Sequence, residues 1–288
     1  MPSISLEEVK KYRTRSYYML PGTRLHTVDE AVDFVNLRGF IFFWPVKNVE
    51  LPSLWAAVAG DRPVPDEHDD PGHITWDWKD RMLGKKRWYY ARILRRRNTF
   101  ISMSTLPYFY ALSPNYGEPE TDYLDQYEEG LMTAEARAVF EALLREGPLD
   151  TLALRRAARM KGPTNDTRFN RALDDLQLEF KVLPVGISDA GSWHYAFIYD
   201  LTHRHIPELV HQARGITELD ARVKLVELYL RSVGVAQEQD IARLFRWEMQ
   251  KLGKALEVLR GDGLIQTGLE LDRSGGNWLA LSEILQGV

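Results

Sequence analysis

The sequence of 288 residues contains no cysteine, and this absence excludes several kinds of chemistry. Disulfide bonds, thiol nucleophiles, cysteine-ligated zinc and cysteine-ligated iron–sulfur clusters all require that side chain. A chain without cysteine also fits the reducing environment of the cytoplasm. We therefore expect a cytoplasmic protein without cysteine-based metal sites or thiol chemistry.

Signals for membranes and for common cofactors are missing as well. The segment 1–8 lacks the basic-then-apolar order of a signal peptide, and no apolar run approaches the roughly 18 residues of a membrane helix. There is no Walker-type loop and no GxGxxG after a strand pattern, so binding of a nucleoside triphosphate or NAD has no support. Spacing alone reveals no Ser-His-Asp arrangement. We expect no membrane partner and no cofactor.

Two groups of histidines could in principle be metal ligands. The segment 68–73 holds two histidines and two aspartates, but it is rich in proline and aspartate and has no recognised ligand spacing. His203 and His205 are too close together in the chain to share one site. We therefore expect no metal ion.

The net charge is −4, but the charges are segregated along the chain. Nine cations and one acid lie between Lys79 and Arg97, whereas the segment 118–129 has six acids and no cation. An acidic protein that binds nucleic acid needs such segregation. The basic run is either a solvated surface or a face that contacts phosphates. We predict that it lies on a helix from about residue 76 to 96.

Two stretches, about 133–200 and 217–281, follow the same plan. Each predicts a helix, a short helix, a third helix and then a strand–turn–strand hairpin. The third helices carry matching apolar residues, namely Ala172, Leu173 and Leu176 in one copy and Ala255, Leu256 and Leu259 in the other. This is the layout of a winged helix-turn-helix. We predict a mainly α fold with small β-hairpin wings, built from three tandem winged helix-turn-helix units in a concave arrangement.

The expected boundaries follow from composition. Residues 1–116 form an N-terminal winged-helix-like unit with the basic helix, 117–132 an acidic linker, 133–212 the second unit and 213–288 the third. In the first unit Thr27 and Glu30 predict a capping box at a helix start, and Gly39 predicts the end of that helix. The following apolar segment, up to Pro45, predicts a buried strand.

Two winged helices make double-stranded DNA the expected partner, while protein docking is the alternative because a fold does not fix a function. The candidate DNA contacts from the basic run are Lys85, Lys86, Arg87, Arg92, Arg95, Arg96 and Arg97. Those from the third helices are Arg168, Arg171, Lys251 and Lys254, with Asn170 and Gln250 beside them. Each of the third-helix residues could instead belong to the polar face that any surface helix exposes.

An ordered set of motifs spans the second and third units. It comprises Tyr199-Asp200-Leu201, Arg204, Pro207, Leu225, Tyr229-Leu230-Arg231, Gly234, Ala236, Asp240-Ile241-Ala242 and Trp247. In these residues the chain resembles the AlkZ family of winged-helix DNA glycosylases. The segment Arg97-Asn98-Thr99-Phe100 is similar to a further family segment, with Asn98 in place of a proline. The resemblance covers about 130–260 and is thin over the first hundred residues.

The resemblance implies a catalytic QxQ or QxD element, which sets a polar side chain and a water molecule against the sugar of an alkylated nucleotide. Aligning Gly39 and Pro45 with the glycine and proline that flank this element puts Ile41 and Phe43 at its two polar positions. Neither side chain can position water, and residues 40–51 contain no glutamine. The family's mechanism is therefore expected to be absent.

Three functions remain open. The first is a DNA-binding protein of repair or damage recognition. The second is a glycosylase that hydrolyses the N-glycosidic bond of alkylated bases with Asp77 or Asp80 as a relocated carboxylate, while Trp76 and Trp78 stack on a flipped base. These tryptophans could instead be core residues, and the carboxylates could complement a helix dipole. The third is a transcription regulator or protein-interaction scaffold.

The basic run separates these hypotheses. A scaffold predicts that the cations of 79–97 point into solvent, whereas repair predicts that they line one concave face together with Lys251 and Lys254.

Overall fold

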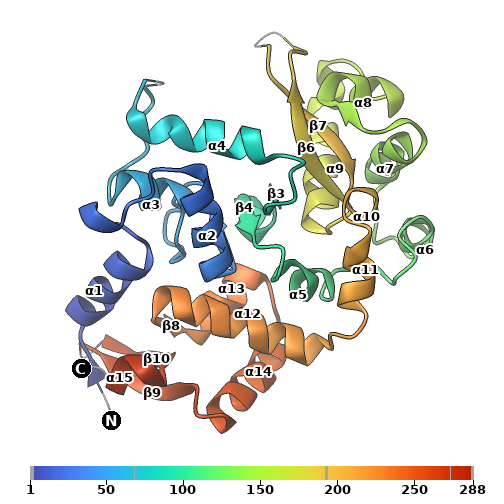
Figure 1. Ribbon diagram of the computed structural model, residues 1–288. Coiled ribbons are helices and arrows are strands. Elements are labelled where there is room, and N and C mark those ends of the chain that lie inside the picture. Colours follow the sequence, from blue (N-terminus) through green and yellow to red (C-terminus); the bar gives the residue numbers. More distant parts are fainter. Residues whose placement is uncertain (1–2, 68, 192–193, 273, 287–288) are drawn as a thin grey trace.

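The computed structural model describes residues 3–67, 69–191, 194–272 and 274–286. The described chain is mainly helical and carries small, mostly antiparallel sheets (Figure 1). Within these ranges no helix has the length and apolar character needed to cross a membrane.

One order of elements, helix–strand–helix–helix–strand–strand, occurs three times along the chain. Repeat 1 contains α2 (Val28–Arg38), β2 (Phe40–Phe42), α3 (Leu54–Ala59), α4 (Ile74–Met82), β3 (Tyr89–Arg92) and β4 (Asn98–Ile101). Repeat 2 contains α7 (Ala134–Glu146), β5 (Leu149–Asp150), α8 (Thr151–Ala157), α9 (Asp166–Leu178), β6 (Val182–Ser188) and β7 (Ala196–Leu201). Repeat 3 contains α12 (Glu218–Val233), β8 (Val235–Gln237), α13 (Glu238–Phe245), α14 (Met249–Gly261), β9 (Ile265–Leu271) and β10 (Ser274–Leu281). The order of three helices and a hairpin predicted for 133–200 and 217–281 is thus confirmed, and a short strand that was not predicted follows the first helix of each.

Further elements connect or extend the repeats. They are β1 (Ser3–Ile4), α1 (Leu6–Ser16), α5 (Leu106–Tyr110), α6 (Asp122–Glu128), α10 (Thr202–His205), α11 (Glu208–Ala213) and α15 (Ser282–Gln286). Short 3-10 turns lie at Pro21–Thr23, Pro71–His73, Leu94–Arg96 and Pro163–Asn165.

The three sheets share one strand order. In each repeat the last strand lies between the other two, which gives β2-β4-β3, β5-β7-β6 and β8-β10-β9. Strand β1 extends the third sheet through parallel pairing with β9, in which Ile4 lies opposite Leu271. Ile4 and Val9 also share an apolar cluster with Leu269. Residues 3–16 therefore pack on repeat 3, although the sequence placed them with the first unit, because this pairing is long-range and leaves no local signal.

Local signals at helix ends are confirmed in repeat 1. Thr27 and Glu30 form the predicted capping box at the start of α2. Gly39 ends this helix with φ +80°, and a Cβ there would lie 2.8 Å from Leu228 of α12. Glycine is needed both for the backbone conformation and for the close approach.

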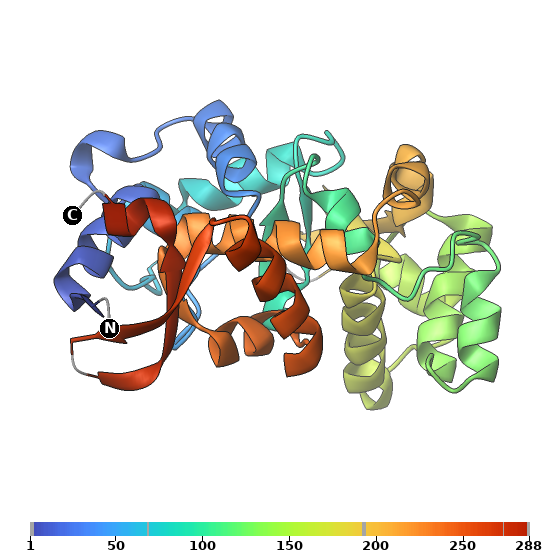
Figure 2. The same ribbon diagram turned by 90° about the horizontal axis from the view of Figure 1, so that it is seen from below.

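Helix α12 lies at the centre of the molecule, between repeat 1 and the rest of repeat 3 (Figures 1 and 2). Its Leu225 and Tyr229 belong to one apolar core with Phe40 and Phe42 of β2. Phe180, which follows α9 of repeat 2, belongs to the same core. The three repeats therefore share one hydrophobic core and are not separate domains joined by linkers.

The acidic segment 117–132 contains helix α6 and is packed structure on repeat 2, not the plain linker that the sequence suggested. The buried carboxylate of Asp122 accepts hydrogen bonds from the backbone N–H groups of Tyr116, Gly117 and Glu118. Tyr123 packs on Phe140 of α7, with ring centroids 4.8 Å apart. A run of acids thus includes one that serves as an internal cap.

Part of the motif set has a structural role. Arg204 donates hydrogen bonds to the carbonyl oxygens of Leu143 and Leu144, at 2.9 and 3.0 Å, at the end of α7. It also pairs with Asp200 at 3.0 Å. Arg204 therefore satisfies carbonyl groups that a helix end leaves without partners.

Replacing Arg204 by methionine is expected to lower the free energy of unfolding by about 1–3 kcal/mol, because the last carbonyls of α7 lose a charged donor. Denaturant unfolding measures the change. Arg145→Met is the matched control, since this exposed arginine only approaches Glu146 at 3.9 Å. Equal losses in the two variants would contradict the capping role.

A pH effect is expected from His203, whose side chain is largely buried beside Phe140. Burial lowers the pKa of His203, with Glu120 acting against it. The unfolded chain takes up this proton near the usual pKa of 6.5, while the folded chain resists it. Stability present above that pH is therefore lost as the pH falls through the lower folded pKa. Thermal unfolding should show a smaller loss of stability on acidification for His203→Gln than for the natural chain. The control His211→Gln, at an exposed site, should lose as much stability as the natural chain.

Candidate nucleic-acid interface

Two segments singled out in the sequence lie side by side in the first sheet. Strand β2 pairs with β4 so that Phe42 lies opposite Thr99, and the N–H of Phe43 donates to the carbonyl of Asn98 at 2.9 Å. A cavity of about 410 Å³ opens where the two segments meet. It is lined by Phe43, Trp44, Pro45, Val46, Lys47, Arg97 and Asn98.

The two positions aligned with the family's polar residues are Ile41 in β2 and Phe43 directly after it. Side chains alternate along a strand, so Ile41 and Phe43 face the core between the sheet and helices α2, α3 and α4. Ile41 is fully buried there. Phe43 is buried as well but borders the cavity. Both aligned positions are therefore apolar and buried.

An exposed aromatic surface adjoins this cavity. Trp44 is 36% exposed, Trp76 at the start of α4 is 39% exposed, and their ring centroids are 5.8 Å apart. Phe43 stacks beneath Trp44 at 5.2 Å. Trp78, the other stacking candidate, is only 3% exposed and packs in the core, because it lies on the inner face of α4. Sequence reasoning missed Trp44.

A lysine is buried under this aromatic surface. The side chain of Lys79 is only 2% exposed, and its Nζ donates to Tyr195 Oη and pairs with Asp80 Oδ1, both at 2.8 Å. The hydroxyl of Tyr195 also donates to Asp80 Oδ1 at 2.9 Å. Five rings surround the ammonium group, with centroids 4.7–5.9 Å from Nζ, those of Trp76, Phe197, Tyr195, Tyr90 and Phe43.

The electrostatics of this cluster follow from burial. Removal from water lowers the pKa of Lys79, against the hydrogen bond and the charge of Asp80. Burial also raises the pKa of the Tyr195 hydroxyl, and the bond to Asp80 adds to this. Asp77 differs from Asp80, since it lies on the exposed side of α4 and pairs with Arg81 at 3.0 Å. Helical spacing could have located Lys79, since it shares a buried face with Thr75 and Trp78.

Comparisons with known proteins place the chain in a family. The family model described as AlkZ related matches residues 25–246. The chain belongs to the AlkZ-related family. A solved structure, the Streptomyces sahachiroi DNA glycosylase AlkZ, is similar in fold with a TM-score of 0.59 and 13% sequence identity, over 99% of this chain and 72% of that one. No curated protein sequence matches this chain.

In this AlkZ-related protein the basic run is not one helix, and that prediction was wrong. Helix α4 ends at Met82, and Gly84 turns the chain with φ +71°. The aromatic residues that follow form the buried strand β3, which pairs with β4. Pairing in the sheet and burial of Tyr89 and Tyr90 outweigh the helix propensity of the surrounding arginines and lysines.

Several cations of this run contact other parts of the AlkZ-related chain. Arg92 pairs with Asp174 at 3.0 Å and Arg96 with Asp175 at 2.6 Å, so both join the hairpin of repeat 1 to α9 of repeat 2. Arg87 pairs with Asp29 at 3.1 Å, and Arg95 donates to the carbonyl of Arg243 at 3.3 Å. Lys85 and Lys86 are exposed in the turn after α4, and Arg97 lines the cavity with Lys47. The buried Lys79 fits neither a solvent-facing nor a groove-lining run.

The candidates on the third helices are exposed. Arg168 approaches Glu135 at 3.8 Å, and Lys251 approaches Glu218 at 3.9 Å. Arg171 on α9 and Lys254 on α14 are also exposed. Repeat 2 exposes three further cations near the turn between α8 and α9 that sequence reasoning did not single out, Arg156, Arg159 and Lys161. The signal was a group of cations at the end of the short second helix and directly after it.

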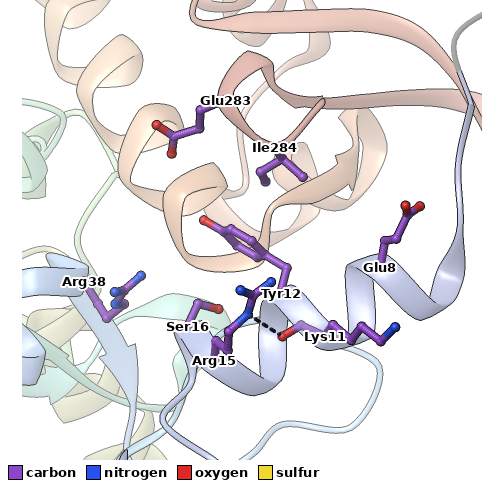
Figure 3. Close-up of a pocket in the computed structure, with 8 residues that line it drawn as sticks. All are labelled: Glu8, Lys11, Tyr12, Arg15, Ser16, Arg38, Glu283 and Ile284. Atoms are coloured by element: carbon purple, nitrogen blue, oxygen red, sulfur yellow. Dashed lines mark hydrogen bonds between the residues drawn. The ribbon is translucent and has the colours of Figure 1, made fainter. Parts of the chain in front are cut away.

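Another cavity, of about 710 Å³, lies away from these motifs between α1, α2 and α15 (Figure 3). Tyr12 and Ile284 face each other across it, with Arg15 and Arg38 on one side. The Tyr12 hydroxyl and an Arg38 N–H both donate to the carbonyl of Arg231, so part of its polar lining is satisfied within the protein. Its walls carry both signs of charge.

No three histidine, aspartate or glutamate side chains are grouped to hold a metal ion within the part of the chain that the structure describes. His68 of the segment 68–73 lies outside the described residues.

The two tryptophans of α4 should differ sharply in their effect on stability. Trp78→Ala is expected to lower the free energy of unfolding by about 3–5 kcal/mol, because it leaves a cavity in the core. Trp76→Ala should cost less than about half as much, because its ring already faces solvent. Denaturant unfolding of both variants measures the difference, and equal losses would contradict it.

Proposed function

We propose that this AlkZ-related protein binds double-stranded DNA and recognises damaged DNA, in a role linked to repair. The observation that carries the proposal is the exposed pair of Trp44 and Trp76 beside a cavity that Lys47 and Arg97 also line. Membership of the AlkZ-related family, and a fold like that of a protein named as a DNA glycosylase, support the same class of partner.

The proposed framework is three winged-helix units around a concave face. The repeated element order and the common strand order of the three sheets support this assignment. In each unit the third helix, α4, α9 or α14, would occupy the place of a recognition helix. We keep the boundaries expected from the sequence, 1–116, 133–212 and 213–288, as part of this proposal, with residues 3–16 packed on repeat 3.

The aromatic pair and the two cations suit complementary parts of DNA. An aromatic plane stacks on an unpaired base with about 1–3 kcal/mol per base, and stacking tolerates any base. Lysine and arginine contact phosphates without reading sequence. A site that combines both favours DNA in which a base has already lost its stacking, because the cost of unstacking is then small.

The glycosylase alternative with a relocated carboxylate has less support. Asp77 is paired with Arg81 on the outer side of α4, and Trp78 is in the core. Asp80 is near the aromatic surface, but Lys79 and Tyr195 already bind its carboxylate. We therefore favour damage recognition over hydrolysis of the glycosidic bond. The scaffold alternative predicts no affinity for DNA, whereas a transcription regulator predicts duplex binding without a preference for the abasic site. The same experiment decides between them.

Equilibrium binding to fluorescent duplexes, intact or carrying one abasic-site analogue, at two salt concentrations tests the proposal. The natural chain should bind in a salt-sensitive way and prefer the abasic duplex. Trp44→Ala with Trp76→Ala should reduce that preference by roughly 5- to 150-fold, which is the value of stacking one base. Lys47→Ala with Arg97→Ala should lower the salt slope by about 2 and leave the preference intact, because each cation neutralises one phosphate.

Two variants at distant exposed positions serve as controls. Tyr116→Ala and Lys10→Ala should bind like the natural chain, since neither residue lies at the proposed interface. Absence of binding to either duplex at low salt would overturn DNA as the partner. Binding that the tryptophan variants do not change would overturn the site but not the partner.

A further inference from the structure

Lys79 is buried more deeply than any other lysine or arginine among the described residues, with 1% exposure of the whole residue. Burying an ammonium group is costly, and lysine is almost never fully buried without a partner. Here one carboxylate and one phenol hydroxyl accept from Nζ, and aromatic faces complete the surroundings. Replacement by an apolar residue often stabilises a protein at such a site, so the lysine is poorly explained by stability alone.

The position of Lys79 connects it with the proposed DNA surface. Trp76 lies 4.7 Å from Nζ by its ring centroid and is also one of the two exposed tryptophans. The Phe43 ring lies 5.9 Å from Nζ and also lines the cavity with Lys47 and Arg97. A single layer of rings is therefore common to the buried amine and to the outer surface.

The surroundings also suit a reactive amine. A lysine in a desolvated pocket holds its amine in the neutral, nucleophilic form more readily than a lysine in water, and the lowered pKa of Lys79 agrees with this. Asp80 supplies a carboxylate in direct contact with that amine. An amine beside a carboxylate is the pair needed to form an imine and then to move a proton.

We infer that Lys79 is a nucleophile that forms an imine with the aldehyde of an abasic site in DNA. The inference rests on the proposed DNA binding and goes beyond it, because it adds a covalent activity to a binding surface. The geometry that points to it is the cluster of Lys79, Asp80 and Tyr195 directly beneath the exposed Trp76.

The chemistry balances without a cofactor. The neutral amine of Lys79 attacks C1′ of the ring-opened sugar, the C–N bond forms, and the aldehyde oxygen leaves as water. The carboxylate of Asp80 then takes a proton from C2′, a C2′=C3′ double bond forms, and the C3′–O bond breaks with the 3′ phosphate leaving with the electron pair. Asp80 releases the proton to solvent water and is again a carboxylate. Water hydrolyses the imine and returns the free amine.

Access requires the ring layer to open, since Nζ is covered in the free protein. Trp76 and Tyr195, whose ring centroids are 6.5 Å apart, belong to α4 and to the segment just before β7. A sugar that enters between them would separate the first repeat from the wing strand of the second. The Lys79 bond to Tyr195 would then be exchanged for the bond to the sugar.

Borohydride trapping tests the inference directly. The natural chain is incubated with a duplex that carries one natural abasic site and with sodium borohydride, which reduces an imine to a stable amine. A covalent protein–DNA adduct is expected, and peptide mass spectrometry should locate it on Lys79. A duplex with a tetrahydrofuran analogue, which has no aldehyde, should give no adduct.

Variants separate reactivity from folding. Lys79→Arg keeps the charge but has no primary amine, so the adduct should be lost while duplex binding persists. Lys181→Arg is the matched control, because Lys181 is also buried beside a carboxylate, Glu179, and is absent from the lining of the cavity at Trp44. Trapping in this variant should equal that of the natural chain. Mapping the adduct on the natural chain decides the question even if Lys79→Arg fails to fold.

The outcomes distinguish this inference from the proposed function. Duplex binding by the natural chain without an adduct, or with an adduct only at other residues, would overturn the inference and leave DNA binding intact. Undiminished trapping in Lys79→Arg would overturn it as well. No binding to any duplex would overturn both.

Discussion

The structure depends on the burial of strand β2 on both of its faces. Phe40 and Phe42 pack in the core around α12, while Ile41 and Phe43 pack in the core of repeat 1. Because alternate side chains point to opposite faces, one short strand ties repeat 1 to repeat 3 and fills its own unit as well. The same constraint sets the site, since the chain leaves this strand at Phe43 and exposes Trp44 directly afterwards.

The contacts between repeats 1 and 2 are a second constraint on the structure. Arg92 and Arg96 are paired with the acids of α9, and Tyr195 binds both Lys79 and Asp80. Two arginines of the basic run thus form ion pairs that connect repeats 1 and 2. Ion pairs that are partly exposed, such as those of these arginines, each contribute little to stability. Buried aromatic contacts, such as that between Tyr89 and Phe180, therefore contribute more to holding repeats 1 and 2 together.

This chain shares the AlkZ fold at 13% identity, and the first repeat combines apolar and polar groups in a small space. Ile41 and Phe43, which the sequence resemblance set at the family's catalytic element, are apolar. An amine, a carboxylate and a phenol lie together beside the Phe43 ring. The proposed functions follow from this arrangement. The outer aromatic surface would recognise DNA, and the buried amine would act on the aldehyde of a damaged sugar.

The sequence by itself determined the local features and the repeated pattern. These features depend on propensity and periodicity among residues that are close together in the sequence. They are the capping box at Thr27, the helix end at Gly39 and the element order of repeats 2 and 3. The motif set also identified the family. Only the tertiary structure decided that β3 interrupts the basic run, that β1 joins the last sheet, and that Trp78 is buried while Trp44 is exposed. Likewise, Tyr195 and Lys79 are 116 positions apart in sequence, and they meet only because long-range apolar burial brings two repeats together.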